Sequence, residues 1–472
     1  MLNLKSIAKI TLLILTSMIA GLVTVEVGGL SHGSYIALLG LPALIILGML
    51  FVFNRNLLFL IIIFTRVSID PFIVNSKMGV LGLGAVLNLI VIIMALNIYP
   101  RLSQLSKKLL MKSWFIFIAI LFISTILSSD ILGSFRFSIN IIVEAALFII
   151  GISLIKNEID YGKWLRIVFL SSVVPIGYAI LEKLLGNAQF YGSEGFRLQG
   201  VFFHPNVLGF YAVLMISVCL LIIKIKIKVF NRIVINTIAL YILIIFTVLL
   251  FTKTRSAWIG CFVFMFLYGA FFEKKYLVYM SIFIALALCV PEVQDRLSNV
   301  SEGEAVWGHG QLNSYSWRQL IWHDGLSWMQ PSKYIFGYGL DSFKANSEKF
   351  FTLYSGQLMG AHNIYVELFF EVGALGLFSY IFISFTLIKH LLKGYNLDSL
   401  VSFITIALIV EYAVFSYSDN MFGYLSFNWI FWFILGLNFG YLDYKSKPVV
   451  NIDNENDAGL NLDVAIKIKR KN

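Results

Sequence analysis

The sequence predicts an all-α protein that crosses a membrane many times. Of its 472 residues, 59% are hydrophobic and only 13% are charged, and the mean hydropathy is +0.85. Apolar runs of about 20 residues, the length that a helix needs to span a bilayer, follow one another along the chain. The shorter alternating segments of a transmembrane barrel are absent. Because backbone groups in lipid must bond within their own segment, we predict helices.

We expect twelve to fourteen spans, the third of them short. They lie at residues 7–25, 34–52, 56–70, 79–98, 113–129, 137–155, 165–184, 205–223, 233–251, 256–272, 276–290, 364–388, 400–418 and 422–441. The first resembles a signal peptide, but with so many spans following we expect an uncleaved helix. The three cysteines lie in apolar runs and are interpreted as small hydrophobic side chains.

The basic residues predict which ends of the spans face the cytoplasm. Most Lys and Arg fall in alternate loops and in the C-terminal tail, as the positive-inside rule requires. This pattern accounts for the net charge of +10, so we expect no nucleic-acid partner. It predicts a multi-pass protein of the cytoplasmic membrane with both termini in the cytoplasm and the long polar segment 291–363 outside.

The chain divides into five predicted parts. These are N-terminal spans (1–190), central spans with arginine motifs on the outer face (191–290), a long extracytoplasmic loop (291–363), C-terminal spans (364–444) and a disordered cytoplasmic tail (445–472). In the loop, residues 316–319 (SWRQ) fit a capping box with Ser316 as the N-cap, followed by a short helix along the outer membrane surface. Residues 336–340 form a Gly-rich turn. The loop holds too little apolar material for a core, so we expect it to lean on the membrane surface.

Among the basic residues on the predicted outer face, four stand out because they oppose membrane insertion in this orientation. They are Arg197, Lys253, Arg255 and Arg318. Each alone could be a side chain that reaches lipid phosphate. Together they favour a phosphate-binding cluster, since the guanidinium group matches phosphate oxygens in pairs.

His362 is the second chemical signal, because it stands where the long loop meets a span. Histidine is the natural general base near neutral pH, although an interfacial polar residue is an alternative interpretation. His204 lies in a His-Pro-Asn sequence that also suits a helix start. The sequence has no metal-ligand spacing, nucleotide-binding fingerprint or serine elbow, so no metal and no cofactor is expected. A base beside several arginines suggests one possible reaction, glycosyl transfer from a polyprenyl-diphosphate-linked sugar.

Four segments occur in an order and sidedness typical of one family. They are residues 197–206 (RLQGVFFHPN), 254–258 (TRSAW), the long loop with its Arg and Trp helix and FGYG at 336–339, and 362–376, which begins HNIY and ends EVGALG. In these segments the chain resembles the O-antigen ligase and polymerase superfamily, with Thr254 replacing the first Ser of the family's Ser-Arg-Ser/Gly turn. The resemblance covers about two-fifths of the chain, and the N-terminal spans match by hydropathy alone.

The resemblance implies a GT-C-like membrane glycosyltransferase. It implies metal-independent, inverting transfer of a glycan from undecaprenyl diphosphate on the outer face, with an undecaprenyl-diphosphate-linked oligosaccharide as donor and as acceptor. By this analogy His362 activates the acceptor, and Arg255 and Arg318 hold the diphosphate. The substrate-binding candidates are Arg197, His204, Asn206, Lys253 and Asn363. Arg296 also lies in the loop, which leaves the loop arginine open.

The motifs leave the exact activity open. Polymerases pass the glycan to another lipid-linked unit, and ligases pass it to a lipid or protein acceptor. The richness in Ile, Lys and Asn suggests an AT-rich Gram-positive source, which favours a polymerase for a capsule, an exopolysaccharide or teichuronic acid. A flippase and a chain-length regulator are candidate partners. A transporter of lipid-linked glycans is the competing class, although Glu144 and Glu411 are the main charges expected near the midplane and no internal repeat is evident.

Overall fold

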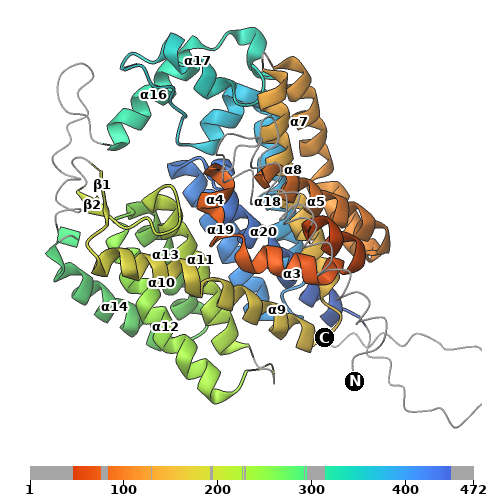
Figure 1. The fold of residues 1–472 in the computed structure, drawn as a ribbon, viewed down its shortest axis with the longest axis vertical. Helices are drawn as coiled ribbons and strands as arrows, with labels where there is room; N and C mark the ends of the chain where they lie inside the picture. Colours follow the sequence, from red (N-terminus) through yellow and green to blue (C-terminus); the bar gives the residue numbers. More distant parts are fainter. Residues whose placement is uncertain are drawn as a thin grey trace, which may run out of the picture.

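The computed structural model describes residues 46–75, 83–128, 130–191, 195–225, 227, 230–291, 293–294 and 314–447 (Figure 1). The predicted span at 7–25, most of that at 34–52, the alternative loop arginine Arg296 and the tail from 448 onward lie outside these ranges.

The described chain is almost entirely helical. Eight segments are long and apolar enough to cross a membrane: α5 (Leu83–Ile98, extended by the 3₁₀ turn η1, Tyr99–Arg101), α8 (Ile131–Leu154), α9 (Glu158–Ser171) with α10 (Val173–Leu184), α11 (Pro205–Lys224), α12 (Arg232–Phe251), α18 (Ile364–Lys393), α19 (Ser399–Ser418) and α20 (Leu425–Lys445). A ninth is the pair α6 (Gln104–Ser113) and α7 (Phe115–Leu127), bent by 41°. Shorter apolar helices are α3 (Arg55–Thr65), α13 (Arg255–Phe271) and α14 (Lys275–Leu288).

Every predicted span from 56–70 onward overlaps one of these helices, so the prediction of an all-α multi-pass membrane protein is confirmed. The remaining elements are short: α4 (Asp70–Asn75), the hairpin β1 (Gln189–Phe190) and β2 (Phe196–Arg197), α16 (Ser314–Trp328), α17 (Ser342–Phe350), and the 3₁₀ turns η3 (Pro331–Lys333) and η4 (Met421–Gly423).

Helices α11 and α20 form the centre of the bundle, since nearly all of their side chains are buried (Figure 1). Helix α20 packs against α8 through glycines. A Cβ added to Gly436 would lie 2.4 Å from the carbonyl oxygen of Phe148, and Gly151 lies directly opposite. Such small residues let membrane helices approach closely, where dispersion contacts can stabilise the pair.

Helix α18 is broken near its N-terminal end, where it meets the segment that includes the predicted Gly-rich turn. Gly373 has φ 68° and ψ −172°, a conformation that only glycine adopts without strain. The backbone of residues 334–339 forms hydrogen bonds with the N–H and C=O groups of α18 that the break leaves unpaired within the helix. Tyr338 N donates to Phe370 O at 3.0 Å, and Ala374 N donates to Tyr334 O at 2.8 Å. Non-helical backbone within a membrane-spanning segment is tolerated where it is bonded within the protein.

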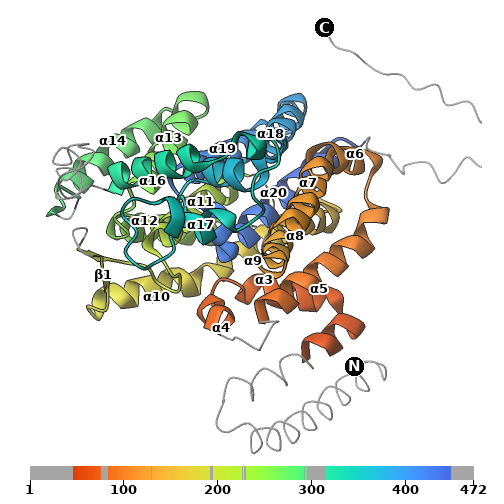
Figure 2. The same cartoon turned by 90° about the horizontal axis from the view of Figure 1, so that it is seen from above.

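The long loop has a core of its own, contrary to our expectation. Its buried side chains include Ile321, Met329, Phe343 and Phe351, and Phe370 of α18 completes the cluster. We underestimated the apolar content because the aromatic residues are dispersed among polar ones. The loop therefore packs on α18, with α16 and α17 in front of the central helices in Figure 2.

The capping-box prediction is also wrong in its register. Helix α16 already includes Ser314, so Ser316 lies inside the helix rather than at the N-cap. Ser316 is buried there. Serine is tolerated near the start of a helix, so the sequence pattern alone could not fix the first residue.

Candidate active site

His362 is held in a strained backbone conformation between the loop and α18. Its φ is +49°, which is uncommon for a residue with a side chain and is often found at functional sites. The indole Nε1 of Trp322 donates to the carbonyl oxygen of Ala361 at 2.6 Å, and the ring of Trp317 lies edge-on to the imidazole at 6.0 Å. The His362 side chain remains 39% exposed. The loop thus fixes this ring while leaving one side of it accessible.

Asp419, directly after α19, is the partner of His362. His362 Nδ1 lies 3.0 Å from Asp419 Oδ1, and Asn206 Nδ2 donates to Asp419 Oδ2 at 2.7 Å. The backbone N–H of Asn420 donates to Oδ1 at 3.0 Å. Asp419 is fully buried, so these bonds compensate for the loss of water.

These contacts determine the protonation of the pair. Burial alone would raise the pKa of Asp419, but the hydrogen bond and charge of His362, the bond from Asn206 and the positive charge of Arg318 hold this pKa well below its usual range. An ionised carboxylate can only accept hydrogen bonds. His362 Nδ1 therefore carries the proton of this bond, and when the ring is neutral Nε2 is the nitrogen that can accept a proton.

Arg197 connects Asp419 to the turn between α12 and α13. Arg197 is buried, with 3% of its surface exposed. Its Nη2 donates to Asn206 Oδ1 at 2.8 Å and to Thr254 Oγ1 at 3.1 Å, and its Nε donates to Thr252 O at 2.8 Å. Arg197 is therefore a buried residue that holds together the start of α11 and the turn between α12 and α13.

The other predicted basic residues lie around this network. Arg255 follows Thr254 as the first residue of α13 and is half-buried. Lys253 has φ +53° in the same turn. Arg318, half-buried on α16, is close enough for its charge to act on Asp419. The structure thus places the predicted residues on the loop, on the hairpin and at helix ends, and their roles in binding or catalysis stay a prediction.

Arg255 also lies at an apolar groove between α12, α13 and α14. The groove has a volume of about 610 Å³. Its walls include Leu243 and Phe246 of α12, Phe262 of α13 and Phe283 of α14, and Arg255 is the single charged residue among the described residues that line it. A long apolar chain with an anionic head matches this combination of surfaces.

Two predicted substrate-binding residues cap helices. His204 Nδ1 accepts from the N–H of Asn206 at the start of α11. The side chain of Asn363 accepts from the N–H groups of Tyr365 and Val366 at the start of α18, and it is buried. Such caps fix the geometry of the helix ends beside Asp419 and His362. A direct contact of either side chain with a substrate stays a prediction.

The sequence interpretation missed Asp419. The only available signal was its position in the short turn at 418–424, which we placed on the outer face. No group of three or more His, Cys, Asp or Glu that could hold a metal occurs in the described part of the chain. Metal independence stays a prediction.

Together these features define a multi-pass membrane protein with a His–Asp pair and several arginines at one end of its spans. Residues 240–381 match the model of a family described as O-antigen ligase, which confirms the resemblance to the O-antigen ligase and polymerase superfamily. The match includes Lys253, Arg255, Arg318, His362 and Asn363, whereas Arg197, His204, Asn206 and Asp419 lie outside it. It supports glycan transfer of the ligase or polymerase type. No curated protein matches the chain.

Proposed function

We propose that this protein is a glycosyltransferase that polymerises undecaprenyl-diphosphate-linked glycan units on the outer face of the cytoplasmic membrane. The observation that carries the proposal is the bonded series His362–Asp419–Asn206–Arg197, which reaches the turn preceding Arg255. It combines an oriented base with cations at the ends of membrane spans.

In the proposed reaction, the acceptor hydroxyl attacks the anomeric carbon of the donor sugar. His362 Nε2 takes the hydroxyl proton while the new C–O bond forms, and the bond between the anomeric carbon and the diphosphate oxygen breaks. Attack from the face opposite the leaving group inverts the configuration. A positioned base contributes about 10²–10⁴-fold in rate.

Arg255 and Arg318 neutralise the negative charge that develops on the departing diphosphate. Cations held in place before the reaction need no reorganisation, which makes their effect on the transition state large. The apolar groove beside Arg255 would receive the polyprenyl chain, since it offers a charged end and apolar walls. Arg197 would act indirectly, because its buried contacts hold Asn206 and Thr254.

The test is a set of single substitutions in cells: His362→Ala, Arg255→Ala and Arg318→Ala. Lys274→Ala is the matched control, because this exposed lysine lies just beyond the other end of α13. For a polymerase, a gel shows loss of long chains while single repeat units accumulate on lipid outside the cell. Normal chain length in all three variants would refute the catalytic assignment.

The same experiment separates the alternatives. A ligase defect leaves glycan on its lipid carrier without transfer to the lipid or protein acceptor. A transporter defect leaves single units inside the cell. Glu144 accepts a hydrogen bond from Asn428 Nδ2 at 2.8 Å between α8 and α20, a contact that supports a structural role for this side chain.

A further inference from the structure

A second cavity lies at the end of the bundle opposite His362. Its volume is about 880 Å³. It is enclosed by the ends of α5, α8 and α20 and by the starts of α3 and α9. Helix α20 begins near Asp419 and ends beside this cavity, so the two sites are about 30 Å apart along its 21 residues.

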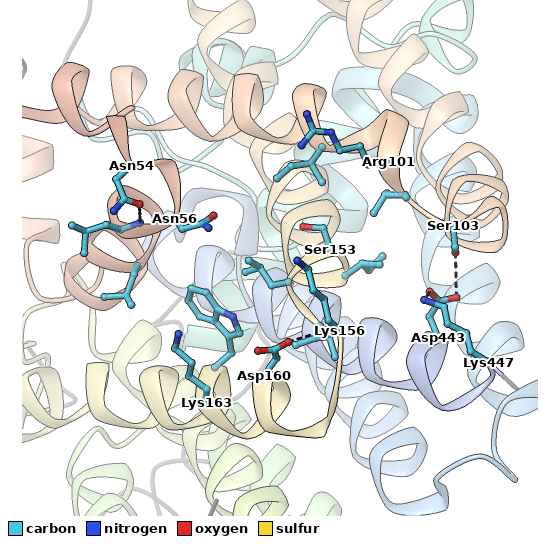
Figure 3. Close-up of a pocket in the computed structure, with 18 residues that line it drawn as sticks. Asn54, Asn56, Arg101, Ser103, Ser153, Lys156, Asp160, Lys163, Asp443 and Lys447 are labelled. Carbon is cyan, nitrogen blue, oxygen red and sulfur yellow. Dashed lines mark hydrogen bonds and ion pairs between the residues drawn. The ribbon is translucent and has the colours of Figure 1, made fainter. Parts of the chain in front are cut away.

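The cavity is lined by an excess of cations. Arg101 lies on one side of the view, and Lys156 and Lys163 come from the facing side (Figure 3). Lys447 is the fourth cation, whereas the acids are Asp160 and Asp443, so four positive and two negative charges leave +2.

The two acids already have partners. Asp160 Oδ2 accepts from the N–H of Lys156 at 3.3 Å. Asp443 Oδ1 accepts from Ser103 Oγ at 3.2 Å, and Lys447 Nζ lies 3.6 Å from Asp443 Oδ2. Within the described part of the chain, no acid forms an ion pair with Arg101, Lys156 or Lys163. Three cations can therefore face an anionic ligand.

The remaining wall of the cavity is apolar in part, beside the polar side chains of Asn54, Asn56, Ser103 and Ser153. Leu57 and Leu60 come from α3, Ile98 from α5 and Trp164 from α9. A free phosphate needs neither such a wall nor so large a volume. Trp together with Lys and Arg at the ends of spans is typical of the layer where lipid headgroups meet hydrocarbon.

We propose that this cavity binds the headgroup phosphate of an anionic phospholipid, with the glycerol and upper acyl chains against the apolar wall. Basic pockets between membrane helices provide this kind of recognition. The loops concerned are among those predicted to be cytoplasmic, where anionic lipid is concentrated. The bound lipid would tie α3, α5 and α9 to the end of α20.

The competing explanation is a general attraction between basic loops and an anionic membrane. It predicts that removing any two exposed cations weakens lipid binding equally. The test therefore compares Arg101→Ala/Lys163→Ala with Lys389→Ala/Lys393→Ala. Both pairs remove two exposed cations, but Lys389 and Lys393 lie at the end of α18 and do not line the cavity.

Native mass spectrometry of the full-length protein in detergent measures the binding of dioleoyl phosphatidylglycerol. We expect the cavity variant to bind the first lipid about 25-fold more weakly than the wild type, roughly fivefold for each cation. The α18 variant should keep the wild-type affinity, and dioleoyl phosphatidylcholine should bind far more weakly. Equal loss in both variants, or equal binding of the two lipids, would overturn the proposal. Displacement of the lipid by an equal concentration of inorganic phosphate would instead identify a site for free phosphate and refute the lipid assignment.

Discussion

Asp419→Asn is the substitution that tests the candidate active site most directly. The carboxylate accepts from His362 Nδ1 through one oxygen and from Asn206 through the other. An asparagine has a single acceptor oxygen and an NH₂ group that only donates. The NH₂ group of the new asparagine must therefore face either His362 Nδ1 or the NH₂ group of Asn206. In the first case Nδ1 loses its proton, and in the second case the hydrogen bond from Asn206 is lost.

The size of the effect follows from the geometry. When His362 takes the acceptor proton, a positive ring faces the Asp419 carboxylate at 3.0 Å. Two full charges at this separation interact by about 5.5 kcal/mol at an effective dielectric constant of about 20. The His362 side chain is 39% exposed, so we take about half of this energy as the effective value. A loss of about 3 kcal/mol corresponds to a rate decrease of roughly 100-fold.

The assay is elongation of a lipid-linked glycan by purified protein, followed by separation of the products on a gel. Asp398→Asn is the control, because Asp398 caps the other end of α19 and asparagine caps a helix equally well. We expect turnover to fall in Asp419→Asn with little change in the KM for the donor. Turnover within threefold of the wild type would show that the carboxylate does not orient or stabilise the base.

The same substitution has a pH signature in stability. The pKa of Asp419 is depressed in the folded protein because the lowering by His362, Asn206 and Arg318 outweighs the effect of burial. The stabilisation is therefore complete above the unfolded value of about 3.9 and is lost as the pH falls toward the folded value. The Tm difference between the wild type and Asp419→Asn should shrink below about pH 4. A difference that stays constant from pH 7 to pH 3 would contradict this linkage.

Two further predictions concern the scaffold and the groove. Gly373→Ala should destabilise the protein by roughly 3 kcal/mol or more, since φ is +68° and the new Cβ would lie 2.2 Å from the carbonyl oxygen of Ile335. Gly177→Ala, which meets nothing within 4 Å inside α10, should raise the Tm slightly; thermal unfolding that ranks the two variants the other way would contradict the role of the break. Ala287→Trp should fill the groove, so that the polyprenyl chain of the donor buries less apolar surface. A loss equivalent to roughly two methylene groups raises the KM for the donor about tenfold. Ile282→Trp, on α14 but outside the groove, should leave the donor KM unchanged. Equal donor KM values for the two variants would refute a polyprenyl site in the groove.

The membrane spans could be predicted because their signal is local. An uncharged run of about 20 residues is already costly in water, so the sequence at 205–223 or 233–251 needs no tertiary information to indicate a helix. The break at Gly373 could not be predicted in this way. A glycine within an apolar run is common in membrane helices, and the partners that permit the break come from residues 334–339 of the preceding loop.

The candidate site was predictable only in part, because some of its contacts join residues that are far apart in the sequence. The basic residues stood out because charge on the outer face is unfavourable in the predicted orientation. His362 stood out because it lies where the long loop meets a span. Asp419 gave no such signal, since an acidic residue in an outer turn is ordinary. Its importance depends on a contact with His362, 57 residues earlier in the chain. Asn206, 213 residues earlier, supplies the other half of its environment.

The arrangement assigns different tasks to the loop and to the spans. The buried series Arg197–Asn206–Asp419 joins the hairpin, α11 and the end of α19, and these elements belong to the bundle that a lipid-linked donor would approach from the bilayer. His362 reaches this network from the loop, whose own core rests on Phe370 of α18. Under the proposed function, the bundle holds the donor and the loop delivers the base toward an acceptor arriving from the aqueous side. The positive-φ backbone of His362 then joins these two parts, so the packing of the loop core determines where the base lies relative to the diphosphate.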